Sequence, residues 1–281
     1  MTDATKKLSG PKVLLEGPSG TGKTYAIGKL VDWAAENNTE VFVLFTENGL
    51  ETLLGYWADK GTDIPPNLHY HSTLTKPIGL ASLKTAAENI GKLSYEMLTK
   101  LVDGKRSENN AALAIITACG DFPDDRTGLK FGPVDSWGAD KIFVIDSLSE
   151  LANAYMKAVI GNKPTASQPD YGVAQNSLMN FLRLCTQGCA CTFVLTAHVD
   201  KQVNELTGAN QIMTKAIGKA IAGDIPQLFS DVIYTVREGD KFYWDTAAAN
   251  VDVKTRNLPI LAKQSPDFGI IMKKWAARGK A

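Results

Sequence analysis

The chain has 281 residues, of which 44% are hydrophobic, and its 30 basic and 30 acidic residues give no net charge at pH 7. This composition supports a sizeable core and excludes a surface coated in positive charge, so contact with nucleic acid would need a local basic patch. No apolar run is as long as a membrane span, and the first ten residues lack the apolar core of a signal peptide. We expect a cytoplasmic protein without a membrane partner, built over 1–281 as one α/β domain.

The first predicted strand, Lys12–Glu16, leads into a glycine-rich turn and then into a helix with apolar residues at helical spacing. The turn reads Gly-x-x-x-x-Gly-Lys-Thr from Gly17 to Thr24, which is the Walker A pattern. Its glycines let the backbone wrap a phosphate with the N–H groups pointing inward, and the following helix directs the positive end of its dipole at the same place. Strand, turn and helix together predict a nucleotide-binding loop.

Individual positions of this loop have expected roles. Lys23 is expected to reach the β- and γ-phosphates, and Thr24 to offer its hydroxyl to Mg²⁺. The residues expected around the phosphates of ATP are Gly17, Pro18, Ser19, Gly20, Thr21, Gly22, Lys23, Thr24 and Tyr25. The alternative is a glycine-rich turn without a ligand, but the flanking strand and helix favour the nucleotide site.

The second predicted strand is the continuous apolar run 41–45, the pattern of a parallel strand covered on both faces. Glu47 follows its carboxyl end, where α/β folds bind their ligands. Its carboxylate either acts as a catalytic base or stabilises the N-terminus of the short helix predicted over 50–57. We favour the catalytic role.

The stretch over about 64–140 has the character of an insertion between two sheet strands. It is predicted to contain, in chain order, a strand, two helices and an exposed loop, over 68–72, 80–102, 111–119 and 120–140. His69 and His71 alternate on the predicted strand and share one face. Two histidines at this spacing are a possible metal site, but no further ligand is evident, so an edge strand is the preferred interpretation.

Four apolar residues, 142–145, end in Asp146 and form a strand of Walker B type behind the Walker A loop. Asp146 is expected to hold Mg²⁺, mostly through water. Many P-loop ATPases place a water-activating glutamate directly after this aspartate, but here that position is Ser147. The base must therefore come from elsewhere, and Glu47 is the best candidate. Glu150 is its rival, although we expect it to lie one turn into a helix and to point away.

A further buried strand, predicted over 192–198, ends at His198, where a γ-phosphate sensor would sit. Its imidazole either donates a hydrogen bond to the phosphate or caps a turn, and the residues alone leave both open. The next segment, 200–224, lacks a clear core period and is interpreted as a mobile loop that carries Lys201, Lys215 and Lys219.

The end of the chain contains a hairpin signal and two basic elements. Strands predicted over 231–236 and 241–246 flank a polar turn. Lys254-Thr255-Arg256 follows the hairpin, and the tail over about 260–281 is basic.

Cys185, Cys189 and Cys191 lie close enough in the sequence to suggest a metal site. Because Cys185 continues a helical apolar face and Cys191 opens an apolar strand, buried free thiols are the preferred interpretation.

The Walker A loop, Glu47, the strand ending at Asp146 and the sensor position at His198 together resemble the RecA-type ATPase core, over about 12–259. The resemblance implies an α/β, RecA-like P-loop NTPase fold, with a mainly parallel sheet, helices on both faces and a C-terminal antiparallel hairpin. It also implies Mg²⁺-dependent hydrolysis of ATP, in which Lys23 and the loop amides bind phosphate, Glu47 polarises water and His198 senses the γ-phosphate. RecA itself usually has glutamine at the sensor position.

The details are most similar to small bacteriophage RecA-like ATP-binding proteins, some of which act in recombination as single-strand annealing proteins. In RecA-type proteins the loop equivalent to 200–224 binds DNA, which implies single-stranded DNA as a partner. The Lys-x-Arg element is similar to the trans-acting element of ring-forming ATPases such as DnaB-like helicases, which implies a homo-oligomer with Lys254 and Arg256 at the neighbour's site. We favour a recombination ATPase; the alternatives are a helicase-like or KaiC-like ring, or a nucleotide-binding regulator with little turnover.

Overall fold

The computed structural model describes residues 8–74, 84, 88, 110–161, 163, 165–203 and 210–279. The helix predicted over 80–102 lies, apart from two of its positions, outside these residues. The helix predicted over 111–119 is confirmed as α5, Ala111–Gly120. Among the described helices, none is long and apolar enough to cross a membrane.

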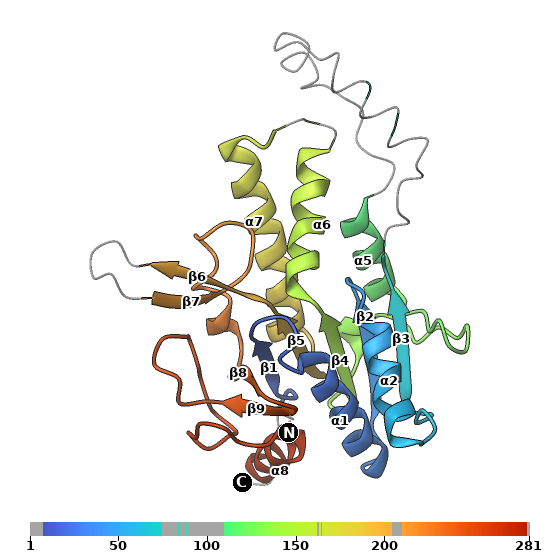
Figure 1. Ribbon diagram of the computed structural model, residues 1–281. Helices are drawn as coiled ribbons and strands as arrows, with labels where there is room; N and C mark the ends of the chain where they lie inside the picture. The colour runs from blue at the N-terminus through green and yellow to red at the C-terminus, as the bar shows by residue number, and fades with distance from the viewer. Residues whose placement is uncertain are drawn as a thin grey trace, which may run out of the picture.

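A seven-stranded sheet forms the middle layer, in the order β3-β2-β4-β5-β1-β8-β9 (Figure 1). In chain order its strands are β1 (Lys12–Glu16), β2 (Glu40–Phe45), β3 (Leu68–Ser72), β4 (Lys141–Asp146), β5 (Thr192–Ala197), β8 (Asp231–Glu238) and β9 (Lys241–Asp245). All neighbouring strands run parallel except β8 and β9, which pair antiparallel. The predicted mainly parallel sheet and its C-terminal hairpin are therefore confirmed.

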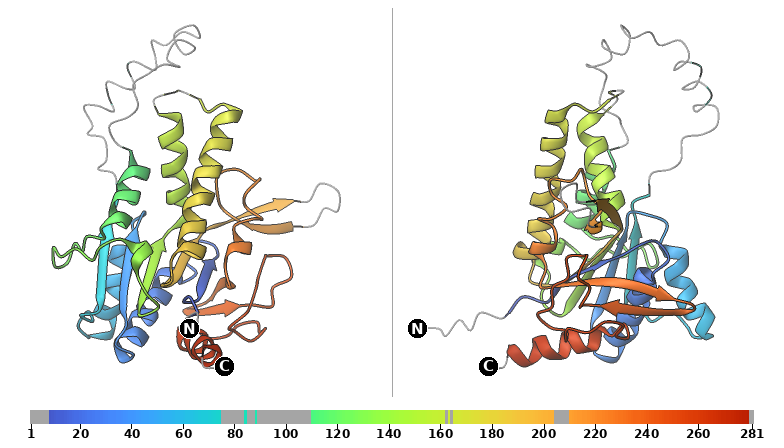
Figure 2. Two further views of the ribbon diagram at one scale, coloured as in Figure 1. Left: turned by 180° about the vertical axis from the view of Figure 1, so that it is seen from behind. Right: turned by 60° about the vertical axis from the view of Figure 1, so that its left-hand side comes forward.

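Helices cover both faces of this sheet (Figure 2). On one face lie α1 (Lys23–Glu36), α2 (Leu50–Lys60) and α8 (Phe268–Arg278), and on the other lie α5, α6 (Leu148–Ile160) and α7 (Gln168–Arg183). Successive side chains of a strand point to opposite faces, so the central strands are apolar throughout. Val43 of β2 packs in the core under α1 and α2, whereas its neighbour Leu44 packs in the core under α5 and α6.

The segment 120–140 contributes to the core, so its prediction as an exposed loop is wrong in part. Phe122, Val134 and Trp137 are buried, the latter two around a short 3-10 turn, Val134–Ser136. The ring of Trp137 lies 4.3 Å, centroid to centroid, from that of Phe42 in β2. The abundance of Asp, Gly and Pro predicts the turns of this segment correctly. It does not indicate that aromatic residues of the segment pack against the sheet.

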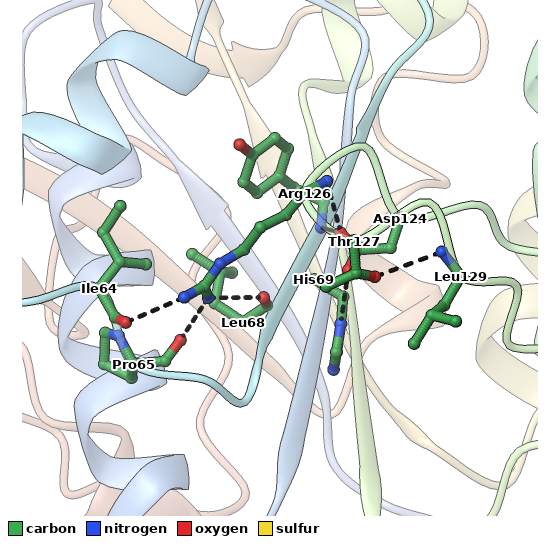
Figure 3. A network of polar contacts seen from close by, with 9 residues as sticks. Ile64, Pro65, Leu68, His69, Asp124, Arg126, Thr127 and Leu129 are labelled. Atoms are coloured by element: carbon green, nitrogen blue, oxygen red, sulfur yellow. Dashed lines mark hydrogen bonds and ion pairs between the residues drawn. The ribbon is translucent and has the colours of Figure 1, made fainter.

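The same segment covers the outer edge of β3, which confirms β3 as an edge strand of the sheet. The amide of Asp125 donates to the carbonyl of Tyr70 at 2.8 Å, and the Asp124 carboxylate accepts from the amide of Tyr70 at 3.2 Å. Nδ1 of His69 lies 3.0 Å from the same carboxylate (Figure 3). The guanidinium of Arg126 donates to the carbonyl of Pro65 at 2.8 Å, which ties the loop to the start of the strand (Figure 3).

His71 pairs with its own carboxylate, because its Nδ1 lies 2.7 Å from Asp125. Both histidines of β3 thus face an aspartate of the covering loop. The described residues contain no group of three or more His, Cys, Asp or Glu side chains placed to hold a metal ion.

The opposite edge of the sheet, strand β9, is covered by the segment 261–264. Trp244 and Gln264 exchange two backbone hydrogen bonds, of 2.8 and 2.9 Å, and the amide of Thr246 donates to the carbonyl of Leu261 at 3.0 Å. Both outer strands of the described sheet therefore have backbone partners on their outer sides.

A two-stranded antiparallel ribbon, β6 (Val199–Val203) and β7 (Asn210–Thr214), projects away from the sheet directly after β5 (Figure 1). The prediction of a loop over 200–224 is therefore wrong for 200–203 and 210–214, which form strands, whereas 215–224 consists of turns and bends. The ribbon is mostly polar, so its stability comes from backbone pairing between strands, which the apolar periodicity of a sequence does not reveal. Beyond it, Ile217, Ile221 and Ile225 join the core beside α7, and a 3-10 turn, Pro226–Leu228, leads into β8.

The three clustered cysteines are buried and carry free thiols, as expected. Cys185 lies in a π-helical turn, Leu184–Gly188, that ends α7. Lys12 lies against this cluster, where its ammonium donates to the carbonyls of Cys189 and Cys191 at 2.8 and 2.6 Å.

Candidate nucleotide-binding site

The Walker A loop connects β1 to α1 at the carboxyl edge of the sheet, and three of its glycines are required there. Gly20 and Gly22 have φ angles of 76° and 84°, the left-handed region that other residues rarely adopt. Gly17 has a different role, because a Cβ there would lie 2.2 Å from the Thr235 hydroxyl. The loop can therefore turn sharply at Gly20 and Gly22, and it packs closely against β8 at Gly17.

Hydroxyl groups hold this loop in place. The hydroxyl oxygens of Thr21 and Thr235 lie 2.7 Å apart, and the Thr21 hydroxyl also donates to the carbonyl of Pro18 at 2.8 Å. The Thr235 hydroxyl donates to the carbonyl of Glu16 at 3.2 Å. The loop is therefore fixed to the end of β8 before any ligand binds, which lowers the entropy cost of binding.

Lys23 lies inside the curve of the loop. Its Nζ donates to the carbonyls of Gly17 and Pro18 at 2.9 and 2.8 Å. Burial lowers the pKa of Lys23 to about 8, although the carboxylates of Asp146 and Glu47 act in the opposite direction. An ammonium held in this way fits the phosphate contact predicted for it.

Thr24 and Asp146 are brought together from α1 and the end of β4. The Thr24 hydroxyl donates to Asp146 Oδ2 at 2.9 Å, and the Thr196 hydroxyl donates to Asp146 Oδ1. Asp146 is 1% exposed, and burial raises the pKa of its carboxyl despite these donors. A hydroxyl and a buried carboxylate at the carboxyl edge fit Mg²⁺, because a divalent cation beside them would offset the cost of burying the negative charge.

Glu47 and His198 also converge, from the ends of β2 and β5. Nε2 of His198 lies 3.4 Å from Oε1 of Glu47. The adjacent imidazole of His198, together with Ser147 and the charge of Lys23, holds the pKa of Glu47 below its usual value. Glu47 is therefore ionised at neutral pH, as a base that accepts a proton from water must be.

These groups surround one open cavity of about 1150 Å³. Lys23 and Thr24 line it from the phosphate loop, and Glu47 and His198 line it from the strand ends. Glu150 lines the same cavity, so the expectation that it points away is wrong. It stands in the first turn of α6, and that helix begins directly over the carboxyl edge of the sheet.

A family model described as an AAA domain matches residues 9–257, which is most of the chain. The chain belongs to this AAA-domain family. Membership makes it a P-loop ATPase in general terms, with the α/β P-loop NTPase fold, and implies ATP binding, typically with Mg²⁺. None of the curated proteins compared with the chain matches it.

Lys254 and Arg256 lie outside the cavity of their own AAA domain. Both side chains are exposed, and the amide of Arg256 donates to Asp231 Oδ1 at 2.9 Å. Asp231 pairs with Val13, near the start of β1, whereas the phosphate loop follows the end of that strand. The two residues thus lie toward the amino end of the sheet, away from the site.

Two residues of the β8–β9 hairpin, Arg237 and Phe242, line the cavity of this AAA domain but were not among the predicted site residues. A Cβ on Gly22 would lie 2.5 Å from Phe242, and the rings of Tyr25 and Phe242 are 5.1 Å apart. The hairpin was evident in the sequence. Its position beside the phosphate loop depends on the pairing of β8 with β1, which the sequence does not encode locally.

Proposed function

We propose that this AAA domain hydrolyses ATP with Mg²⁺ and couples that reaction to single-stranded DNA. The observation behind the hydrolysis is the convergence of Thr24, Glu47 and His198 on the cavity that holds the phosphate loop, with Asp146 hydrogen-bonded to Thr24 behind it. Catalysis of this kind depends mainly on positioning and on stabilisation of charge.

Each residue then has a definite task. Lys23 and the loop amides bind the β- and γ-phosphates, and Thr24 and Asp146 hold Mg²⁺, which supplies positive charge when bound. Glu47 accepts a proton from the attacking water. His198 contacts Glu47 and lines the same cavity, so it would orient the base and sense whether the γ-phosphate is present.

The β6–β7 ribbon is the element that we propose to contact DNA. Its strands begin and end beside the sensor, because the amide of Lys215 donates to the carbonyl of His198 at 2.8 Å. Lys201, Lys215 and Lys219 are exposed on and after the ribbon, where they are available to phosphates. A shift of His198 on loss of the γ-phosphate would therefore move the base of the ribbon.

Further support comes from the resemblance to small bacteriophage RecA-like ATPases, some of which anneal single strands in recombination. The second candidate is a helicase-like or KaiC-like ring, which Lys254 and Arg256 favour because both side chains are exposed and accessible to a neighbouring copy. A regulator with little turnover is the third. In each case ATP occupies the same cavity.

The deciding experiment measures phosphate release by the full chain with and without single-stranded DNA, and DNA affinity at several salt concentrations. The variant that combines Lys215→Ala with Lys219→Ala should weaken DNA binding and flatten the salt dependence by up to about two phosphate contacts, with ATP binding intact. The matched control combines Lys273→Ala with Lys274→Ala, which removes the same charge from exposed positions on α8.

Unchanged DNA affinity and salt slope in the ribbon variant would remove the ribbon from the proposal. A turnover that DNA does not stimulate would favour the ring, and negligible turnover under both conditions would favour the regulator.

A further inference from the structure

Arg237 reaches the nucleotide cavity from the end of β8. Thr235, two residues earlier on the same face of the strand, contacts Thr21 of the phosphate loop. Because residues i and i+2 of a strand share a face, Arg237 continues from Thr235 along the side of β8 that faces the loop. It accordingly lines the same cavity as Lys23.

The guanidinium is positioned by its own hairpin. Its Nε donates to the carbonyl of Gly239 at 2.8 Å, and its central carbon lies 5.7 Å from the centre of the Phe242 ring. Phe242 is the cross-strand partner of Arg237 and packs against Gly22. The cation is therefore held relative to the phosphate loop, and its two Nη groups have no hydrogen-bond partner among the described residues.

The charged residues that line the cavity indicate that the Arg237 guanidinium is available to bind an anion. Among the described residues, its acidic lining is Glu47, Glu51, Asp59 and Glu150, and its basic lining is Lys23, Arg237 and His198. Lys23 is buried in the loop, and His198 is paired with Glu47. Arg237 is exposed, so it is the most accessible of these three basic residues to an anion that enters the cavity.

We propose that Arg237 binds oxygens of the β- and γ-phosphates of the nucleotide in its own chain, through the two Nη groups that the hairpin leaves open. Arginine forms paired hydrogen bonds to phosphate, which a planar guanidinium fixed at Nε can offer in one orientation. This assignment rests on the proposed nucleotide site, and it differs from the role predicted for Arg256, which is contact with the site of a neighbouring copy.

The test compares the binding of ATP, ADP and AMP to the full chain and to Arg237→Ala, Arg237→Lys and Lys241→Ala. Lys241→Ala is the matched control, because it removes one exposed positive charge from the same hairpin without lining this cavity. Thermal melting establishes that each variant is folded.

Arg237→Ala should weaken ATP binding about tenfold or more, the usual effect of losing hydrogen bonds to a charged group, with a smaller loss for ADP and little for AMP. Arg237→Lys should recover part of the loss, and Lys241→Ala should bind ATP within about twofold of the wild type.

An equal loss for all three nucleotides would overturn the assignment and place Arg237 against the base, the ribose or the α-phosphate. Unchanged ATP binding in Arg237→Ala would also overturn it, provided that Lys23→Ala abolishes binding. If Lys23→Ala binds ATP normally, the nucleotide site itself is wrong, so the two failures are distinguishable.

Discussion

The side chains of Glu47 and His198 meet across strand β4, because they follow β2 and β5, which lie on either side of it. Their 3.4 Å contact passes over the strand that ends in Asp146. The proposed base, sensor and magnesium ligand therefore lie at three adjacent strand ends, so a displacement of His198 would change its contact with Glu47 directly.

Glu47→Gln should bind ATP with unchanged affinity but hydrolyse it at least ~100-fold more slowly. Glutamine keeps the size and one hydrogen-bonding oxygen but cannot accept the proton of the attacking water. Phosphate release and equilibrium ATP binding are measured side by side, with Glu150→Gln as the matched variant on the same cavity. Normal turnover in Glu47→Gln together with a loss in Glu150→Gln would transfer the role of base to Glu150.

ATP binding should draw a proton from solution at pH 9 and almost none at pH 7. The pKa of Lys23 is lowered to about 8 by burial, so the amine is largely neutral at pH 9 in the free protein. Phosphate charge favours the ammonium and raises this pKa, so binding is coupled to protonation. Calorimetry in buffers of different ionisation enthalpy measures the uptake.

Lys273→Ala on α8 serves as the control for this proton uptake, which it should leave unchanged. Lys23→Ala should not bind ATP at all, because it loses the cation inside the phosphate loop. Binding at pH 9 without any proton uptake would show that Lys23 does not change its protonation.

Glu16→Gln should make the stability of the protein less sensitive to pH. Burial raises the pKa of Glu16 from its ordinary 4.5 to about 7, although the Thr214 hydroxyl donates to the carboxylate at 2.6 Å. Between these values the folded state holds a proton that the unfolded state releases, so stability is lost as pH rises through about 7. Glutamine keeps an acceptor for Thr214 and does not ionise.

Urea unfolding at pH 5 and pH 8 measures this effect. Between those pH values the wild type should lose up to about 3 kcal/mol relative to Glu16→Gln. Glu36→Gln, at an exposed position of α1, is the control and should follow the wild type. Parallel pH profiles for the wild type and Glu16→Gln would mean that Glu16 is already ionised in the folded protein at pH 5.

Arg256→Ala should lose ~10³-fold or more in turnover and regain activity when mixed with Lys23→Ala. Each variant lacks a different half of a site shared between copies, so a mixed assembly contains some complete sites. Steady-state phosphate release at several mixing ratios measures the recovery. If no mixture exceeds the sum of its parts, Arg256 does not act in trans.

Lys23→Ala mixed with Arg237→Ala is the matched control for that experiment. Both residues line the cavity of a single chain, so their mixture should show no recovery.

Local pattern accounts for the predicted site residues that the structure brings together. The phosphate loop lies within one short segment, and Glu47, Asp146 and His198 each follow an apolar run, so parallel strands bring them to one edge. The Glu47–His198 contact depends on strand order, and the position of Arg237 depends on the register of β8 against β1. Neither is encoded in adjacent residues.

The errors have the same origin. The β6–β7 ribbon is mostly polar and is stabilised by pairing between its two strands. Its sequence therefore lacks the apolar pattern that predicts a buried strand and is typical of a loop. The orientation of Glu150 follows from where α6 begins over the sheet. The burial of Trp137 follows from its contact with Phe42 in a distant strand.

The covered edges of the sheet bear on how the protein behaves in concentrated solution. A bare edge strand is a template on which other chains add, and this is a common route to aggregation and domain swapping. Asp124 and Asp125 occupy that position on β3, and the segment 261–264 occupies it on β9. Backbone pairing between copies at these two edges would require displacing the covers, so damage to either cover should appear as turbidity before nucleotide binding is affected.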